Sequence, residues 1–215
     1  MPVIVETEVF TFDELSSAAR EEAREWYRHN RAGHLDDDWW DTVYSDFKTI
    51  CDMFGIALKT TPVTLIGGGT RRKPCIYFRG FSSQGDGASF EIEHYAYARG
   101  SVAGIMAHAP KDEALHVIAR RLADIQRRNF YQLYARAEQR GFHCHEHTMH
   151  IDVCRDDAEM TSDAEEAVSE ALRDLARWLY GCLEREYDYL QSDEMVDEAI
   201  VANGYTFTAE GERFG

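Results

Sequence analysis

Residues 75–98 read CIYFRGFSSQGDGASFEIEHYAYA, and they decide the fold class. Two segments rich in β-branched and aromatic side chains flank the polar turn SSQGDG at residues 82–87. Glycine and aspartate tolerate the positive φ angles of a tight hairpin turn, so this stretch predicts an antiparallel hairpin. Residues 56–66 form a further β segment, which a GGG break at residues 67–69 separates from the hairpin. Together the segments predict a β meander.

Helical patterns surround the meander. The first expected helix begins at the capping box of residues 11–14, and the second begins at the DDD of residues 36–38. Three further helices are expected over residues 111–140, 163–190 and 192–203. Further strands are expected at residues 3–10, 142–152 and 205–208. No repeat or linker divides the chain. We therefore expect a single α+β domain over residues 1–215, in which an antiparallel meander packs against several helices, two of them long.

Charge is the most informative feature of the composition. The chain has 39 acidic and 23 basic residues, a net charge of −16. Residues 151–215 hold 18 acidic and 5 basic residues, a net of −13, whereas residues 111–140 have a net of +3. This distribution predicts an acidic face built by the last third of the chain and no direct contact with nucleic acid. A surface kept acidic for solubility is the alternative.

The cysteines and the apolar runs bear on the compartment. Five cysteines are spread widely without a C-x-x-C pair, which argues against a disulfide framework and a zinc knuckle. No apolar run approaches the roughly 18 residues of a membrane span, and the first residues lack a basic region followed by an apolar stretch. We expect a cytoplasmic protein that neither spans a membrane nor is exported.

A histidine-rich stretch, HCHEHTMH at residues 143–150, supplies side chains that bind transition metals. On a strand, His143, His145 and His147 would share one face at intervals of about 7 Å. The spacing is not that of a helical H-E-x-x-H site, so a ligand from elsewhere in the fold would have to complete the shell. The alternative is a solvent-facing polar strand, and we expect no metal and no cofactor.

The glycine-rich turns were considered as anion or nucleophile sites, because backbone amides in such turns can point at an anion. The turn at residues 82–87 fits neither the P-loop pattern G-x-x-x-x-G-K-[ST] nor the pattern G-x-S-x-G before a helix. The GGG at residues 67–69 is followed by TRRK, which favours a mobile basic turn. No residue is assigned a catalytic role, and an enzyme is the less favoured interpretation.

Residues 78–90, FRGFSSQGDGASF, resemble the F-x-G-F-x-S-Q-G-D-G-x-x-F signature of a family of proteins from bacteriophages, prophages and other mobile elements. The likeness extends to FDELS at residues 12–16, NFYQL at residues 129–133 and much of residues 192–211. The resemblance implies a mobile-element origin and a bacterial host cell, and it implies no particular activity. The residues of the signature loop are Gly80, Ser83, Gln84, Gly85, Asp86 and Gly87.

Charge and resemblance together favour a non-enzymatic inhibitor of a host defence complex, of the anti-CRISPR or anti-restriction type. Its carboxylates would stand in for DNA phosphates on a basic, nucleic-acid-binding surface of the host protein. The expected contacts cluster around the start of the helix predicted at residues 163–190. They are Asp156, Asp157, Glu159, Asp163, Glu165, Glu166 and Glu170.

Two alternatives remain open. An antitoxin-like regulatory module would bind a basic toxin through aromatic anchors at Trp39, Trp40 or Tyr187. A small hydrolase or transferase would use the loop at residues 82–87 or the histidine-rich stretch, and a bound metal would support it. The sequence also leaves a homodimer open.

Overall fold

The computed structural model describes residues 6–31, 38–156 and 158–215. The chain divides into a terminal unit, residues 1–40 with 185–215, and a central unit, residues 41–184. The single domain expected over residues 1–215 stays a prediction, since a division into units does not decide it. The strand expected at residues 3–5 and the helix start expected at Asp36 and Asp37 lie outside the described residues.

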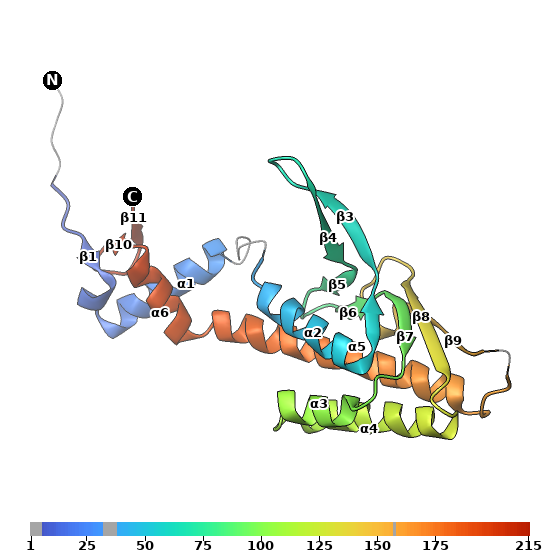
Figure 1. The fold of residues 1–215 in the computed structure, drawn as a ribbon. Coiled ribbons are helices and arrows are strands. Elements are labelled where there is room, and N and C mark those ends of the chain that lie inside the picture. The colour runs from blue at the N-terminus through green and yellow to red at the C-terminus, as the bar shows by residue number, and fades with distance from the viewer. Residues whose placement is uncertain (1–5, 32–37, 157) are drawn as a thin grey trace. The chain divides into compact units, whose positions relative to one another are not determined.

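The two ends of the chain build the terminal unit (Figure 1). Its elements are β1 (Phe10–Thr11), the 3-10 turn η1 (Phe12–Glu14), α1 (Ser17–Arg31), α6 (Asp193–Ala202), β10 (Thr206–Phe207) and β11 (Arg213–Phe214). Strand β10 lies between β1 and β11 in an antiparallel sheet, where a strand is expected at residues 205–208. Buried apolar side chains form its core: Phe12, Leu15, Ala19, Ala23, Tyr27, Val196, Ile200 and Phe207.

Local capping chemistry in the terminal unit is confirmed. The backbone N–H of Thr11 donates to Glu14 Oε2 over 2.8 Å, as expected for a capping box. This box opens the short turn η1, and α1 begins only at Ser17. The hydroxyl of Ser192 accepts the N–H of Met195 at the start of α6. One side chain expected on the buried face, Ala18, is exposed.

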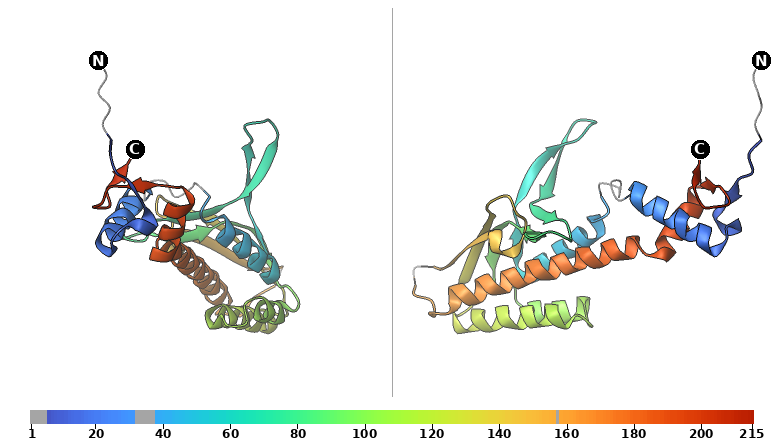
Figure 2. Two further views of the ribbon diagram at one scale, coloured as in Figure 1. Left: turned by 90° about the vertical axis from the view of Figure 1, so that its left-hand side faces the viewer. Right: turned by 180° about the vertical axis from the view of Figure 1, so that it is seen from behind.

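The central unit contains an antiparallel sheet of order β2-β7-β8-β9. Its strands are β2 (Ile56–Leu58), β7 (Ile92–Ala96), β8 (Leu133–Gln139) and β9 (Met149–Arg155), and its helices are α2 (Asp41–Phe54), α3 (Ser101–His108), α4 (Glu113–Arg128) and most of α5 (Ala164–Leu190). Figure 2 shows α5 lying along the strands with α4 beside it. The predicted α+β class is confirmed, with α5 as one long helix.

Trp178 anchors α5 within the central unit through two contacts. The indole N–H of Trp178 donates to Asp112 Oδ2, the N-cap of α4, over 2.7 Å. The ring of Trp178 stacks on Phe47 of α2 at a centroid distance of 6.4 Å, and Phe47 in turn contacts Phe90 at 5.0 Å. Phe47 and Phe90 are fully buried, so this contact lies in the core.

Two hairpins form separate two-stranded sheets: β3 (Thr60–Thr64) with β4 (Thr70–Pro74), and β5 (Ile76–Arg79) with β6 (Gly87–Phe90). Three single residues separate consecutive strands and meet at one point, which we call the three-way junction. Lys59 N–H donates to Glu91 O, Glu91 N–H donates to Cys75 O, and Cys75 N–H donates to Lys59 O, over 2.9, 2.9 and 2.8 Å. The Glu91 carboxylate also binds Lys59 Nζ at 2.7 Å and the Tyr77 hydroxyl at 3.0 Å.

The long helix expected over residues 111–140 is wrong beyond residue 128. Helix α4 ends at Arg128, and residues 133–139 form β8. Asn129 caps the helix, and its buried amide donates to Ile125 O and to Thr161 Oγ1. Phe130 and Tyr131 then take φ angles of 56° and 60°, which reverse the chain. Positive φ is costly for such residues, so this turn carries no signal in the sequence.

Other predicted boundaries also move. The strand expected at residues 142–152 begins only at Met149, after a loop and a 3-10 turn, η2 (Glu146–Thr148). The TRRK segment expected in a mobile turn lies in strand β4, while the turn itself is confined to residues 65–69. Helix α3 has no counterpart among the expected elements.

Candidate functional site

The signature loop connects β5 to β6, as the turn chemistry predicted. Asp86 closes it, because its Oδ2 accepts the N–H of Ser82 over 2.9 Å and the N–H of Ser83 over 2.6 Å. Gly80 has a φ of +43°, and a Cβ there would come within 2.6 Å of the same carboxylate oxygen. The aspartate of the signature therefore shapes the loop, and Gly80 makes room for it.

Two further glycines bring the loop against the histidine-rich stretch. A Cβ at Gly85 would lie 2.6 Å from Nδ1 of His143, and one at Gly87 would lie 2.7 Å from Cβ of His145. Such distances are well inside van der Waals contact. These two glycines are thus accounted for by close packing of residues 85–87 on residues 143–145.

Aromatic side chains hold the other side of the loop. The Tyr180 hydroxyl of α5 donates to Gly80 O over 3.1 Å, and its ring packs on Phe81 at a centroid distance of 5.5 Å. The Arg79 guanidinium lies 4.2 Å from the centroid of the Phe142 ring. The loop is therefore fixed by α5 and by residues 142–145, and its exposed residues are Gly80, Ser82, Ser83 and Gln84.

The enzyme alternative stays a prediction. Within the described residues, no hydrogen bond joins the hydroxyl of Ser82 or Ser83 to a histidine, as an activated nucleophile would require. The rings of His143 and His145 stack at 6.1 Å, and those of His145 and His147 meet edge to face at 5.9 Å. Across the described ranges, no three His, Cys, Asp or Glu side chains come together as metal ligands would.

The acidic residues proposed as partner contacts lie in the central unit, and two of the six described are already neutralised. Asp163 pairs with Arg128 of α4 over 2.7 Å, and this hydrogen bond lowers the pKa of Asp163. Glu170 pairs with Arg177 over 2.9 Å, which lowers its pKa in the same way. Four remain exposed without a basic partner in the described chain: Asp156, Glu159, Glu165 and Glu166. The seventh, Asp157, lies outside the described residues.

Glu146 adds a second carboxylate to Arg177. Its Oε1 accepts from Arg177 Nε over 3.0 Å. Burial alone would raise the pKa of Glu146, but the hydrogen bonds from its own backbone N–H and from Arg177 outweigh burial, and its pKa is lowered. Arg177 therefore ties η2 to α5, next to the signature loop, and contributes to the fold rather than to a free basic surface.

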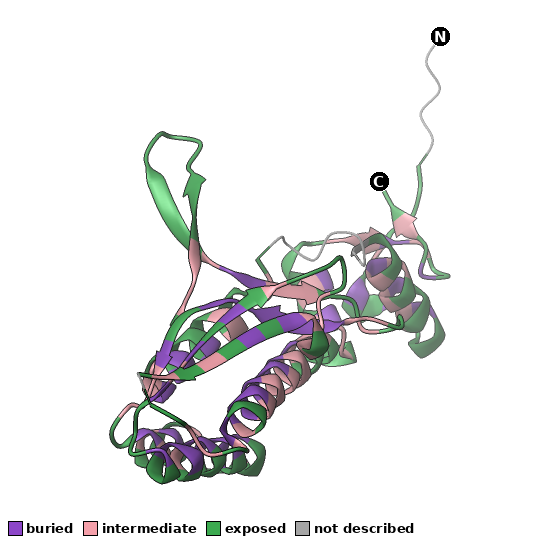
Figure 3. Ribbon diagram, turned by 90° about the vertical axis from the view of Figure 1, so that its right-hand side faces the viewer, coloured by how far each residue is buried: buried purple, intermediate pink, exposed green. Residues whose placement is uncertain are grey.

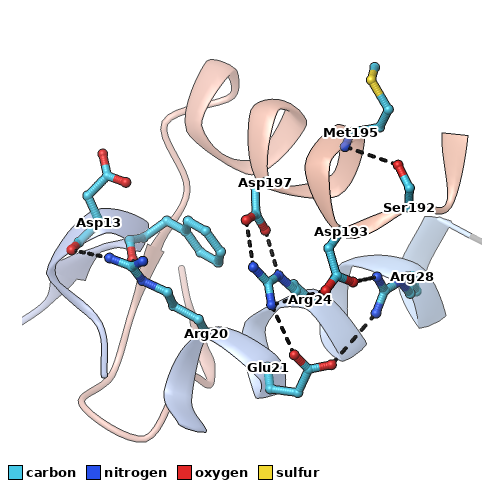
Figure 4. A network of polar contacts seen from close by, with 10 residues as sticks. Asp13, Arg20, Glu21, Arg24, Arg28, Ser192, Asp193, Met195 and Asp197 are labelled. Atoms are coloured by element: carbon cyan, nitrogen blue, oxygen red, sulfur yellow. Dashed lines mark hydrogen bonds and ion pairs between the residues drawn. The ribbon is translucent and has the colours of Figure 1, made fainter. Parts of the chain in front are cut away.

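The terminal unit uses its arginines internally (Figure 4). Arg24 of α1 makes a two-pronged bond to Asp197 of α6, at 2.7 and 2.6 Å, and this bond raises the pKa of Arg24. Arg28 bonds to Asp193, whose pKa it lowers, and Arg20 donates to the carbonyl of Asp13 over 2.6 Å. The guanidinium groups therefore join α1 to α6 and to the N-terminal segment.

Negative charge is concentrated in this unit. Residues 1–40 and 185–215 hold 18 acidic and 6 basic residues, a net of −12, whereas residues 41–184 hold 21 and 17, a net of −4. On its two helices, four glutamates are exposed and have no basic partner in the described chain: Glu22, Glu25, Glu194 and Glu198. The last third of the chain thus does not belong to one acidic unit, because residues 151–184 fold into the central unit and residues 185–215 into the terminal one.

Sequence reasoning missed the contribution of α1 to the acidic unit. The signal was present, since Arg20, Arg24 and Arg28 recur at four-residue intervals and lie on one helical face. Asp193 and Asp197 have the same spacing on α6. Matching the two stripes would have predicted that the arginines are bound within the fold.

The aromatic residues considered as anchors also lie in the terminal unit. Trp39 packs edge to face on Trp40 and on Tyr187, at centroid distances of 5.5 and 5.9 Å. All three are partly exposed. They form one aromatic cluster built from both ends of the chain.

Comparison with known proteins gives one match. Residues 39–193 match a family model described as a domain of unknown function, DUF8835. This range covers the central unit and the signature loop. Neither the curated proteins nor the solved structures yielded a match. In the described part of the chain, no helix combines the length and the apolar character needed to cross a bilayer.

Proposed function

We propose that this chain, which belongs to the DUF8835 family, is a non-catalytic protein that binds a basic surface of another protein through exposed carboxylates of the terminal unit. The observation that carries the proposal is the internal use of Arg20, Arg24 and Arg28. Because these cations are bound within the unit, the exposed carboxylates of Glu22, Glu25, Glu194 and Glu198 have no basic partner in the described chain. An unpaired acidic surface attracts basic partners and accelerates their association.

The proposed partner is a nucleic-acid-binding surface of a host defence complex, of CRISPR or restriction type. Such a surface is basic because it neutralises phosphates, so it offers the complementary charge. A mobile-element origin and inhibition by acidic DNA mimicry belong to this proposal. The exposed carboxylates at Asp156, Glu159, Glu165 and Glu166 are its second candidate contact set.

Two charge-reversal variants separate the contact sets. One replaces Glu22, Glu25, Glu194 and Glu198 by lysine, and the other makes the same replacement at Asp156, Glu159, Glu165 and Glu166. Both change the net charge equally. The assay measures displacement of labelled DNA from purified CRISPR effector complexes and restriction enzymes, at low and high salt.

We expect the wild type to displace DNA less well as salt rises, and the terminal-unit variant to lose more activity than the central-unit variant. Displacement that is independent of salt would contradict the electrostatic mechanism. Equal inhibition by the wild type and the terminal-unit variant would exclude that unit as the contact surface.

The aromatic cluster favours the antitoxin-like module as a second candidate. Large aromatic side chains are the commonest anchors of protein interfaces. Replacing Trp39 and Tyr187 by alanine should then weaken binding to a basic toxin more than the reversal of Glu22 and Glu25. The opposite order supports the acidic surface.

A further inference from the structure

The β3–β4 hairpin stands apart from the body of the central unit as a two-stranded arm (Figure 1). Thirteen consecutive residues, 61–73, are exposed, and Figure 3 shows the arm green along its length. An isolated two-stranded hairpin is at best marginally stable in water. Here the three-way junction and the register from Thr60↔Pro74 to Thr64↔Thr70 hold it in place.

The arm differs in charge from the rest of the molecule. Residues 53–85 contain no acidic residue and five basic ones, in a chain with 39 acidic and 23 basic residues. The basic residues are Lys59, Arg71, Arg72, Lys73 and Arg79. Lys59 lies at the base of the arm and is paired with Glu91, so the carboxylate of Glu91 does not offset the charge of the other basic residues. The arm is therefore a local positive element on an acidic protein.

The ribbon has a defined face. Val63 pairs with Arg71 and Thr61 with Lys73, so these four side chains share one side of the arm. Arg72 points to the other side, where its Nε donates to Thr60 Oγ1 over 2.7 Å. Arg71, Arg72 and Lys73 are all exposed and have no acidic partner among the described residues, and Arg72 is bound to Thr60.

The tip of the arm is apolar and its turn is formed. Leu65 is 48% exposed and Ile66 110% exposed. Leu65 N–H donates to Gly69 O over 3.1 Å, and Gly68 N–H donates to Leu65 O over 3.0 Å, with positive φ at both glycines. An ordered turn that presents two aliphatic side chains to water suggests a contact at the tip.

Basic residues and prolines can also protect exposed strand edges from aggregation. That explanation accounts for Pro62 and for the presence of charge. Edge protection commonly uses lysine, so it accounts for part of the positive charge as well. It leaves Leu65 and Ile66 without a role, because aliphatic tips promote association. The combination indicates an anionic partner with an apolar interior.

The net charge of −16 does not prevent such a contact. At about 3.3 Å per residue, Arg71 lies about 13 Å along the ribbon from the junction and the tip more than about 20 Å. The Debye length at physiological salt is about 8 Å. The carboxylates of the body are therefore largely screened at the outer half of the arm. The expectation of no nucleic-acid contact rests on the charge of the whole chain, and a DNA contact by this arm would contradict it.

We propose that the β3–β4 arm binds double-stranded DNA. The major groove of B-form DNA admits a two-stranded β-ribbon. Arg71 and Lys73 contact phosphates from one face of the ribbon, and threonine hydroxyls beside them add hydrogen bonds. Leu65 and Ile66 at the tip reach the base edges in that groove, where apolar side chains contact the thymine methyl group. This activity goes beyond the proposed function and uses a different part of the chain.

The test measures the affinity of the full chain for a fluorescent mixed-sequence DNA duplex, by anisotropy, between about 50 and 200 mM salt. Arg71→Gln with Lys73→Gln removes two phosphate contacts. It should reduce the slope of log affinity against log salt by about 1.8, so that binding weakens roughly 20-fold at 200 mM salt and roughly 200-fold at 50 mM. Ile66→Ser should weaken binding without changing that slope.

Lys48→Gln with Arg120→Gln is the matched control, because both residues are exposed in helices of the same unit and the net charge changes equally. It should leave binding unchanged. Circular dichroism verifies that each variant is folded. The proposal is overturned if the wild type does not bind the duplex at low salt, or if the control weakens binding as much as the arm variant. It is also overturned if sedimentation shows a dimer that only the arm variant dissociates, since the arm would then contact the acidic surface of a second copy.

Discussion

Alanine in place of Gly87 should destabilise the central unit, whereas alanine in place of Gly104 should stabilise it. At Gly87 the new Cβ would lie 2.7 Å from Cβ and 2.8 Å from Cα of His145, and 2.9 Å from Cys144 O. Two of these atoms belong to the backbone, so residues 143–145 would have to move. Overpacking of this kind costs about 1–3 kcal/mol.

Gly104 offers the opposite case. It lies within α3, and a Cβ there would meet no atom within 4 Å. Alanine is favoured over glycine in a helix by about 0.5–1 kcal/mol. The two variants have the same composition, yet their unfolding free energies should differ by about 1.5–4 kcal/mol.

Urea denaturation followed by circular dichroism compares the variants, and hydrogen exchange of the β6 and β8 amides assigns the change to the central unit. Equal stability of Gly87→Ala and wild type would refute the reasoning. In that case the packing of the signature loop on residues 143–145 would not explain its last glycine.

Three more predictions concern other regions. Arg24→Met should lower the stability of the terminal unit by about 2 kcal/mol, as measured by hydrogen exchange of the α1 amides, because the two-pronged charged bond to Asp197 is lost. Arg127→Met is the comparison and should cost under about 0.5 kcal/mol, because Arg127 and its partner Asp124 are 68% and 66% exposed. Phe130→Gly should raise stability by about 0.5–1 kcal/mol, because its φ of 56° suits glycine; a lower urea midpoint would contradict this. The pKa of Glu170 is lowered from its usual value of 4.5, so the ionised side chain stabilises the fold at pH values above 4.5. This contribution should disappear as the pH falls through the lowered pKa, and Arg177→Met should flatten the stability–pH curve in that range.

Local chemistry made part of the fold predictable. The turn at residues 82–87 was identified because its glycines and Asp86 suit a hairpin, and the structure adds that Asp86 bonds to two backbone amides. Helix α5 was identified by its apolar periodicity, and it ends at the predicted Leu190. Both features depend on residues close in sequence.

The failure at residues 129–140 has a different cause. Leu133 and Ala137 fit a helical repeat of four, and with Ala135 they also fit the repeat of two that β8 adopts. The deciding event is the reversal at Phe130 and Tyr131, which sequence preferences argue against. Hydrogen bonds from the distant Asn129–Thr161 pair contribute to the structure there, and a local pattern cannot reveal them.

Ion pairs of the acidic residues could not be predicted for a similar reason. Charge was counted along the chain, whereas α6 folds against α1, more than 160 residues away in sequence. The pairing of Asp163 with Arg128 and of Glu170 with Arg177 likewise depends on tertiary contacts. Whether the acidic residues at positions 156–170 contact a partner stays a prediction.

The three-way junction limits how this sequence can change in length. Its ring of backbone bonds through Lys59, Cys75 and Glu91 fixes the alignment of three strand pairs at once. One residue inserted into any strand beside it would turn that strand's side chains to the opposite face. Insertions and deletions among relatives should therefore occur at the distal turns, residues 65–69 and 82–85, where a hairpin can lengthen by whole cross-strand pairs while the junction stays closed.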